Sequence, residues 1–442
     1  MGNLATPESV RKLQDTLNAK AKERPELRFH ALYDKVYRKD FLAHAYACCR
    51  ANKGAAGVDG QEFADIEAYG LERWLGELAE GLRTKTYRPE AVKRVWIEKE
   101  NGKLRPLGIP TIRDRVAQRA AVLVLEPIFE ADLQPEQYGY REGRSALDAV
   151  RGVHRLLNAG HREVVDADLS GYFDSIPHAE LMKSVARRVV DGTMLHLIKM
   201  WLEAPVEESD GKGGKKRSTQ NREEGRGIPQ GAPISPLLAN LYMRRFVLAW
   251  RQLGYAQRLR AHIVNYADDL VILCKGNAEQ ALAGLRTLMG RLKLTVNEDK
   301  TRACRAPQEP FTFLGYTFER CYSERTGRAY IGTRPSKKSI RRLKSQISTA
   351  TQANTTWMSA EAKVQQINRQ RTGWANYFCL GPVGKAYRAI ERHTTHRLCQ
   401  WLWRKHQARG RARTRYDTRY VHRKLGLIHL RGRTWSSPWA NA

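Results

Sequence analysis

The segment IVNYADDLVILC, residues Ile263–Cys274, places two adjacent carboxylates between two apolar runs. Neighbouring side chains of an extended strand point to opposite faces, so Asp268 and Asp269 could not serve one site from the middle of a strand. We therefore expect an antiparallel hairpin in which Tyr266–Asp269 forms the tight connection and carries both acids at its tip. Such a turn is more often structural than chemical, so the segment alone leaves both interpretations open.

The chain around this segment is strongly basic. It has 442 residues, with 77 Lys and Arg against 46 Asp and Glu and a formal net charge of +31. Neutralising phosphates releases counterions, so a polyanion is the expected partner, with nucleic acid favoured over a membrane surface. A chain of this length is longer than one ordinary domain, so two or three domains are predicted.

Hydropathy and cysteine spacing exclude several classes of protein. The apolar runs are shorter than the roughly 18 residues that a membrane-spanning helix needs, and the first residues lack the apolar core of a signal peptide. The seven cysteines contain no C-x-x-C pair, so neither a zinc ribbon nor a disulfide framework is predicted. We expect a cytoplasmic protein with reduced thiols and no membrane association.

The patterning divides the chain into zones. Residues 8–85 show helical spacing, whereas strand-like and helix-like segments alternate over 87–314 and predict a mixed domain. Residues 335–442 carry 23 Lys and Arg against 3 Asp and Glu, which predicts a separate, basic helical domain. The polar, Gly-rich stretch 209–227 is expected to be a mobile hairpin or loop, and whether its basic tip touches RNA stays open.

A second acidic segment changes the weight given to the first. The strand-like run EVVDADL, Glu163–Leu169, places Asp166 and Asp168 on one face. Joining a nucleotide to a 3′-hydroxyl uses two Mg²⁺ ions about 4 Å apart, and Mg²⁺ prefers hard oxygen ligands. Asp168 together with Asp268 and Asp269 would provide such a ligand set within a positive surround.

Eight segments in order resemble a known family. YADD, the earlier DLSGYFDSI and the intervening GIPQGAPISPLLANLYM are similar to the palm motifs of reverse transcriptases. The order found in the group II intron branch is also matched by KLRPLGIPTIRDRVAQRA, YGYREGRSALDAV, LKLTVNEDKT and FTFLGYTF, and RTGWANYF resembles the thumb, or maturase, domain of that branch. The resemblance runs from about Leu32 to about His406.

The resemblance implies an α+β fold of the right-hand polymerase type. Fingers and palm, built from an antiparallel sheet and helices, would be followed by an α-helical thumb/maturase domain. The expected boundaries are 1–85 for an N-terminal helical extension and the start of the fingers, 86–320 for fingers and palm, 335–405 for the thumb/maturase domain, and 406–442 for a short basic DNA-binding extension without an endonuclease.

The resemblance also assigns the metal-binding residues. By motif position, Asp168, Asp268 and Asp269 would be the catalytic, metal-binding aspartates, and the Leu169 carbonyl an additional ligand. Two Mg²⁺ ions would be the cofactors, with Mn²⁺ as a substitute.

Further residues would bind the incoming nucleotide. Phe173 matches the aromatic side chain that crowds the sugar 2′ position and favours deoxynucleotides, the alternative being a core residue. Lys103 and Arg105 would hold the triphosphate, although Lys103 could equally be a solvated hairpin lysine. Gln230 and Gly231 match the P-Q-G element beside the nascent base pair, where Gly permits close backbone approach.

Other polar residues keep two interpretations each. Lys300 could donate a proton to the leaving pyrophosphate or form a structural salt bridge. Arg141, Arg144 and Ser145 could support the template strand or belong to an ordinary loop.

The segment SKKSIRRLKSQI predicts a thumb helix that follows a duplex backbone. Ser336 is its expected N-cap, and Ile340, Leu343 and Ile347 form an apolar stripe. Trp374 further along could stack on RNA bases, as could Tyr377, but core packing is favoured for both. The cations expected to bind nucleic acid are Lys337, Lys338, Arg341, Arg342 and Lys344.

These observations predict an RNA-directed DNA polymerase that also binds its parent group II intron RNA to promote splicing and mobility. Its partners would be the intron RNA, a DNA target and primer, and deoxynucleoside triphosphates, in a nucleoid-associated location. Two alternatives stay open: an RNA-binding splicing cofactor without polymerase activity, and a domesticated or defence-associated reverse transcriptase of the same branch.

Overall fold

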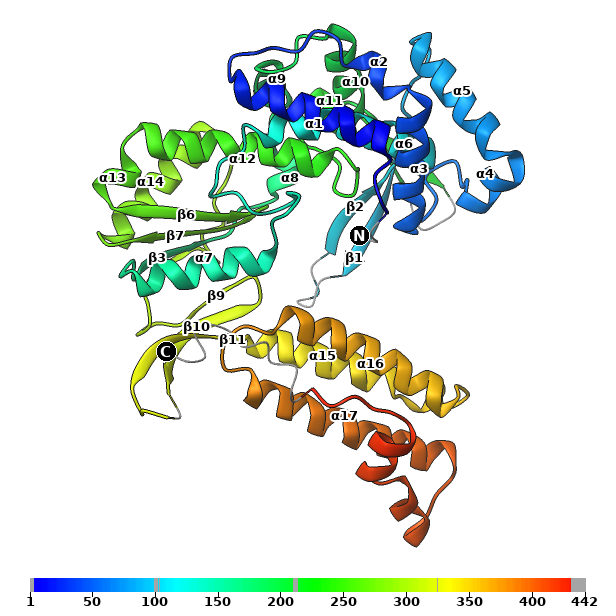
Figure 1. Cartoon of the computed structure of the whole chain (residues 1–442), viewed down its shortest axis with the longest axis vertical. Coiled ribbons are helices and arrows are strands. Elements are labelled where there is room, and N and C mark those ends of the chain that lie inside the picture. The colour runs from blue at the N-terminus through cyan, green and yellow to red at the C-terminus, as the bar shows by residue number, and fades with distance from the viewer. Residues whose placement is uncertain (1–3, 99–101, 103, 210–213, 324, 431–442) are drawn as a thin grey trace.

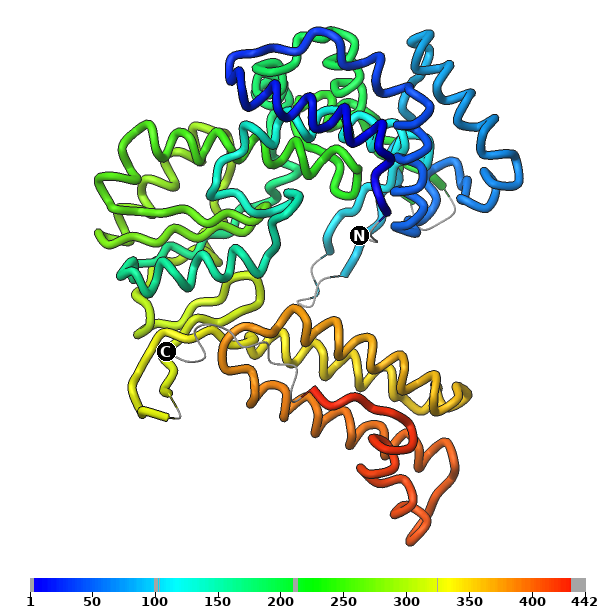
Figure 2. The backbone as a smooth tube through the Cα atoms, in the orientation of Figure 1, coloured from blue at the N-terminus to red at the C-terminus, as the bar shows by residue number. Residues whose placement is uncertain are grey.

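The computed structural model describes residues 4–98, 102, 104–209, 214–323 and 325–430. Helices and sheets combine in it as the expected α+β polymerase fold, with fingers, palm and a helical thumb arranged around an open side (Figure 1). The tube in Figure 2 follows the chain from the N-terminal helices through the palm to the thumb.

The N-terminal helices are α1 (Glu8–Glu23), α2 (Tyr33–Val36), α3 (Lys39–Ala51), α4 (Phe63–Tyr69) and α5 (Leu71–Arg83). Helices α1, α2 and α3 pack around α6 (Ile112–Glu130), which is buried on most sides, and α5 packs against α3 and α4. Because Pro127 lacks an N–H, the carbonyl of Leu123 loses its donor within the helix, and Gln14 Nε2 of the first helix donates to it at 3.0 Å. The long-range bond thus joins the first helix to α6.

The fingers sheet has the strand order β2-β1-β4-β5. Its strands are β1 (Val92–Glu98), β2 (Leu104–Ile109), β4 (Val206–Ser209) and β5 (Lys215–Ser218). The antiparallel pair β4–β5 confirms a hairpin in the basic stretch 209–227, and residues 210–213 at its tip lie outside the described residues. In Figure 1 the β1–β2 hairpin projects toward the thumb helices.

The palm sheet has the antiparallel order β6-β7-β3-β8 and is covered on both faces. Val165 and Ile272 belong to the core on one face, and Val164 and Val271 belong to the core on the other. Helices α12 (Ser235–Gln252) and α14 (Ala278–Arg291) lie over the first face, and α7 (Ala146–Asn158) lies over the second (Figure 1). This alternation buries both faces and holds the strand ends still. The strands are β3 (Glu163–Ala167), β6 (Ala261–Tyr266), β7 (Asp269–Cys274) and β8 (Arg302–Arg305).

The helices of the palm precede, interrupt and follow these strands. They are α7 (Ala146–Asn158), α8 (Tyr172–Ser175), α9 (His178–Ala186), α10 (Gly192–Leu202), α11 (Gln220–Glu223), α12 (Ser235–Gln252), α13 (Tyr255–Arg258) and α14 (Ala278–Arg291). None of the helices in the described ranges is long and apolar enough to cross a membrane.

A small sheet of order β11-β10-β9 links the palm to the thumb. Its strands are β9 (Phe311–Phe313), β10 (Tyr316–Tyr322) and β11 (Ala329–Pro335), and the thumb helices are α15 (Lys337–Ala350), α16 (Ala360–Tyr377) and α17 (Gly384–Lys405), with a short turn η1 (Ala353–Thr355).

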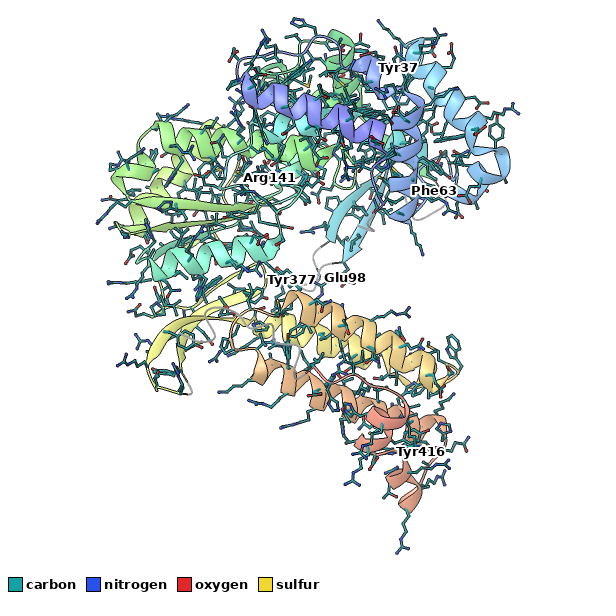
Figure 3. All side chains as sticks on the ribbon, in the orientation of Figure 1. Tyr37, Phe63, Glu98, Arg141, Tyr377 and Tyr416 are labelled. Atoms are coloured by element: carbon teal, nitrogen blue, oxygen red, sulfur yellow. The ribbon has the colours of Figure 1, made fainter. Side chains whose placement is uncertain are left out.

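The C-terminal segment packs back onto the thumb. It forms the turns η2 (Gly410–Tyr416) and η3 (Tyr420–Lys424), and Tyr416 shares an apolar core with α16 and α17 (Figure 3). Leu430 is fully buried against α15 and α17. The described part of the segment after residue 405 therefore belongs to the thumb core rather than standing apart from it.

Candidate active site

The acidic hairpin forms as expected. Tyr266, the last residue of β6, pairs with Asp269, the first residue of β7, so Ala267 and Asp268 make the connection. Ala267 has a φ of +59°, the positive value that tight hairpin turns require at their first central position. The prediction of both acids at a hairpin tip is confirmed.

Buried amide side chains hold this turn from behind. Asn265, which is fully buried, donates from Nδ2 to the carbonyl of Ala267 at 2.8 Å. Asn240 of α12 donates to the carbonyl of Gly139 at 2.7 Å, and a Cβ at Gly139 would lie 2.6 Å from the nitrogen of Ala267. Neither amide was expected from the sequence, although an Asn one position before the YADD tetrapeptide in an otherwise apolar strand was a usable signal.

Asp168 reaches the same region from the end of β3. Ala167 pairs with Leu270 of β7, which brings the following Asp168 beside the hairpin tip. Its Oδ2 accepts hydrogen bonds from Asn297 Nδ2 at 3.0 Å and from Lys300 Nζ at 2.9 Å. Of the two interpretations of Lys300, this geometry matches the salt bridge.

The three acids face two neighbouring cavities. Asp168 and Asp268 line one of about 1440 Å³, here called the catalytic cavity, whereas Asp269 lines a second of about 1390 Å³ under the thumb. Although Asp269 keeps contact with solvent, desolvation, followed by the charges of Asp268, Asp168 and Asp166, raises the pKa of its carboxyl to about 7. The carboxylates therefore repel one another across the boundary between the cavities.

The three acids offer the kind of ligand atom that magnesium prefers, but they do not form a closed ligand cluster by themselves. Within the described ranges, no three His, Cys, Asp or Glu side chains converge as a ligand set. Two carboxylates on one cavity and a third coupled to them electrostatically still offer the hard oxygens that Mg²⁺ takes while it keeps several waters. Leu169, whose carbonyl was expected to be a ligand, lines the same cavity with its side chain buried.

The residues expected to bind nucleotide gather around the catalytic cavity. Arg105 of β2, Phe173 of α8 and Gln230 all line it. Phe173 is half-buried, and its carbonyl accepts from Ile228 N at 2.8 Å, which fixes the loop before α12 against α8. Lys103 lies outside the described residues.

A glycine is required at position 231 for a reason that differs from the expected approach to the nascent base pair. Its φ is +114°, and a Cβ there would lie 2.6 Å from the carbonyl oxygen of Gly108 in β2. Gly108 in turn donates its N–H to the carbonyl of Gln230 at 2.6 Å. The close backbone approach joins palm to fingers, so Gly231 is needed before any nucleic acid is present.

Comparison with known proteins agrees with these features. Residues 97–318 match the family described as reverse transcriptase (RNA-dependent DNA polymerase), and residues 340–420 match the group II intron maturase-specific domain. Protein YkfC of Escherichia coli is 34% identical, over 74% of this chain and 93% of that protein. The chain belongs to the reverse transcriptase family.

Other relatives of this reverse transcriptase are more distant. The group II intron-encoded protein LtrA of Lactococcus lactis is 29% identical, over 65% of this chain but only 56% of LtrA. A chain in the solved structure titled "Partial Cas6-RT-Cas1--Cas2 complex" is 25% identical, with a TM-score of 0.35 over 59% of this chain and 43% of that one, too low a similarity to carry structural detail.

Of the two interpretations of Arg141, the structure fits the role within the loop. Its side chain is only 6% exposed and is paired with Glu130, with Nε at 3.0 Å from the carboxylate. Its Nη1 donates to the carbonyls of Gln134 and Gln137 at 2.7 and 2.8 Å, inside the reverse transcriptase domain (Figure 3). The guanidinium is thus used within the protein and fixes the segment that supports the hairpin tip.

Arg144 and Ser145 are also held locally. The Arg144 guanidinium stacks 5.2 Å above the ring of Tyr138 and donates to the carbonyl of Pro135 at 2.6 Å, while the side chain remains half-buried. Ser145 caps α7 in a reciprocal arrangement with Asp148. For Ser145 the loop interpretation fits better than template contact.

The first thumb helix matches the sequence expectation. Ser336 caps α15, its Oγ accepting from Ser339 N at 3.2 Å, and Ile340, Leu343 and Ile347 face the core. Of the five cations expected to bind nucleic acid, Lys344 is half-buried. The other four are exposed, namely Lys337, Lys338, Arg341 and Arg342.

The cations of α15 face both cavities. Lys338 and Arg342 line both cavities, whereas Lys337 and Arg341 line the cavity under the thumb. A polyanion bound across the acids would therefore meet these side chains from the thumb.

The aromatic residues of α16 pack inward, as favoured. Trp374 packs against Phe378 in a tilted arrangement with 4.7 Å between ring centroids, and Tyr377 donates from its hydroxyl to the carbonyl of Leu314 at 2.8 Å. Tyr377 lies at the thumb end nearest the palm (Figure 3). These rings join the thumb to the small linking sheet.

Proposed function

We propose that this reverse transcriptase extends a DNA primer on an RNA template by two-metal nucleotidyl transfer. The observation that carries the proposal is the meeting of Asp168 and Asp268 on one cavity with Asp269 coupled to them. When bound, two Mg²⁺ ions, or Mn²⁺ in their place, would supply activation of the primer 3′-hydroxyl and charge neutralisation of the triphosphate. Asp168, Asp268, Asp269 and the Leu169 carbonyl are the groups that would hold them.

The remaining residues around the cavity orient the nucleotide. Arg105, together with Lys103, holds the triphosphate, since a guanidinium can bind phosphate through two hydrogen bonds. Phe173 restricts the space at the sugar 2′ position, and Gln230 lies beside the base pair. Lys300, whose Nζ lies 2.9 Å from Asp168 Oδ2, would support that carboxylate, and a proton transfer from it to the leaving pyrophosphate is the alternative role.

We further propose that the thumb binds the parent group II intron RNA and promotes its splicing and mobility. The match of residues 340–420 to the maturase-specific domain and the exposed cations of α15 support this second activity. Its partners would be the intron RNA, a DNA target with its primer, and deoxynucleoside triphosphates.

A double variant and a matched control separate polymerase activity from RNA binding and splicing. Asp268→Asn with Asp269→Asn should lower primer extension on an RNA template by about 1,000-fold or more, because it removes two anionic metal ligands. RNA affinity and intron splicing should remain near the wild-type level. The matched control is Asp299→Asn, which removes an exposed carboxylate that lines neither cavity.

Each outcome decides between the alternatives. Undiminished synthesis by the double variant would refute the polymerase assignment. Splicing activity without any synthesis by the wild-type protein would favour the splicing cofactor, and synthesis without binding to a group II intron RNA would favour a domesticated or defence-associated enzyme.

A further inference from the structure

A third cavity, of about 440 Å³, lies on the palm away from the acids. Among the described residues, its lining shares no member with that of the catalytic cavity. It lies between the end of α6, the end of α9 and the middle of α12, where the charged lining residues are Arg28, Asp132, Lys183, Arg187, Arg244 and Arg245.

The one carboxylate in this lining is already paired. Asp132 contacts the fully buried Arg188, with Oδ1 2.9 Å from Nη2, and its other oxygen pairs with Arg187. The second acid nearby, Glu180, lies 3.3 Å from Lys183 and 3.2 Å from Arg245. These two acids are therefore shared among four cations.

Two further arginines donate to backbone carbonyls and form no ion pair with any acid in the part of the chain that the structure describes. Arg244 Nε donates to the backbone carbonyl of Asp132 at 2.7 Å, and Arg28 Nη2 donates to the carbonyl of Ala186 at 3.0 Å. Burial, followed by the charge of Arg187, lowers the pKa of Arg244 to about 10. Six cations thus surround two carboxylates. Arg244, one of the two cations without an ion pair, is held in a partly desolvated position.

Such an excess of positive charge is unfavourable unless an anion offsets it. Guanidinium groups bind phosphate oxygens through paired hydrogen bonds, which suits them to this task better than ammonium groups. The side chains of Lys183 and Arg187 are 72% and 42% exposed, so the positive surface continues from the cavity to its rim. A chain of phosphates fits this extended arrangement better than a single phosphate ion.

We propose that this cavity, the Arg28/Arg244 site, binds the phosphate backbone of a nucleic-acid strand outside the polymerase cleft. The site does not depend on the catalytic assignment, because it shares no residue with the acids or with α15. Its occupant is recognised through phosphate groups, so a free pyrophosphate is the competing source of the same chemistry.

The test is photo-crosslinking of the full-length protein to a single-stranded RNA of about 20 nucleotides that contains 4-thiouridine, long enough to span the cavity and its rim. We expect wild-type crosslinks in peptides that contain residues 183–187 and 241–245, in addition to peptides of α15. Arg28→Gln with Arg244→Gln should reduce the first group about fivefold and leave the α15 group unchanged. It should also flatten the salt dependence of RNA affinity by about 0.7 for each phosphate that the variant no longer neutralises.

Matched variants control for charge and folding. Arg11→Gln with Arg258→Gln removes two exposed arginines outside the site and should leave every crosslink unchanged. Arg244→Lys keeps the charge but loses the paired hydrogen bonds, so it should retain more of the first group of crosslinks than Arg244→Gln does. If the Gln double variant unfolds, Arg28→Gln alone, on an exposed side chain, should still reduce the first group about twofold.

Two results would overturn the proposal. One is equal crosslinking at 183–187 and 241–245 in the Arg28/Arg244 double variant and in the charge-matched control. The other is loss of these crosslinks with millimolar pyrophosphate while those at α15 persist, which would assign the site to a small phosphate compound. Neither result bears on the primer-extension test of the aspartates.

Discussion

At the scale of single residues, the turn that carries Asp268 depends on a neighbour without charge. Asp268 projects from a turn that Asn265 holds by a hydrogen bond to the Ala267 carbonyl. Because Asn265 is completely buried, its amide has no access to water as a replacement partner.

Asn265→Ala should therefore lower activity more than binding. We expect a loss of about 1–3 kcal/mol in the free energy of unfolding, from the unsatisfied Ala267 carbonyl, and a fall in kcat for primer extension of about tenfold or more. Urea unfolding and steady-state extension measure the two effects. Asn158→Ala, at the exposed end of α7, is the control, and equal kcat values for the two variants would contradict the positioning role.

The residue scale also shows what sequence alone can predict. The position of Asp268 and Asp269 at a hairpin tip followed from strand alternation and turn chemistry, both of which are local. The burial of Arg141 did not follow, because its partners Glu130 and Gln137 are brought to it by the fold of the preceding helix and loop. A cation in a loop motif does not reveal from sequence whether it faces phosphate or protein.

At the scale of elements, helix ends position whole segments. Asp191 caps α10 by accepting from Thr193 N and Met194 N at 3.0 Å each, and its other oxygen accepts from Leu32 N and Tyr33 N at 2.8 Å each. A single carboxylate thus joins the start of α10 to the start of α2. Partial burial acts to raise the pKa of Asp191, but these four N–H groups outweigh it and lower the pKa.

Asp191→Ala should lower the free energy of unfolding by about 2–3 kcal/mol, since it removes charge-assisted bonds at two helix starts. A lowered pKa means that the folded state favours the ionised carboxylate. The stabilisation is therefore present above the pKa of the unfolded state, about 3.9, and is lost as the pH falls through the pKa of the folded state. Chemical unfolding at neutral pH and at successively lower pH measures this. The difference between wild type and variant should shrink only below about pH 4, and a difference that is independent of pH would contradict the account.

The start and the buried face of α15 were also predictable from the sequence, but the chain segment that packs against this helix was not. Ser336 and the stripe Ile340, Leu343 and Ile347 identify α15 from sequence because capping and helical periodicity are local rules. The return of the chain to bury Leu430 against the same helix depends on residues far apart in the sequence, and no local pattern encodes it.

At the scale of the whole molecule, a tyrosine of the linking sheet is a central contact of the joint between palm and thumb. Tyr316 of β10 donates to the carbonyl of Tyr377 at 2.5 Å, and its oxygen accepts from Cys379 N at 3.1 Å and Leu380 N at 3.3 Å. The ring is fully buried, so these backbone groups have no alternative partner.

Tyr316→Phe should loosen this joint without touching the acids. We expect the rate of the first nucleotide addition to stay within about twofold, while products become shorter because the thumb holds the duplex less firmly. Extension on a long RNA template with a trap for dissociated enzyme measures product length. Tyr322→Phe, on the exposed end of the same strand, is the control, and unchanged product length in Tyr316→Phe would contradict the role of the joint.

The central claim is that Asp168 and Asp268, with Asp269, form one metal-binding site. Oxidative cleavage with Fe²⁺ in place of Mg²⁺ tests this directly, because hydroxyl radicals cut the backbone beside the bound ion, whatever the polymerase activity. We predict cuts near residues 168 and 268–269 that excess Mg²⁺ suppresses and that Asp168→Asn with Asp268→Asn abolishes, while Asp299→Asn retains them. Cuts elsewhere only, or undiminished cuts in the Asp168/Asp268 variant, would contradict the account.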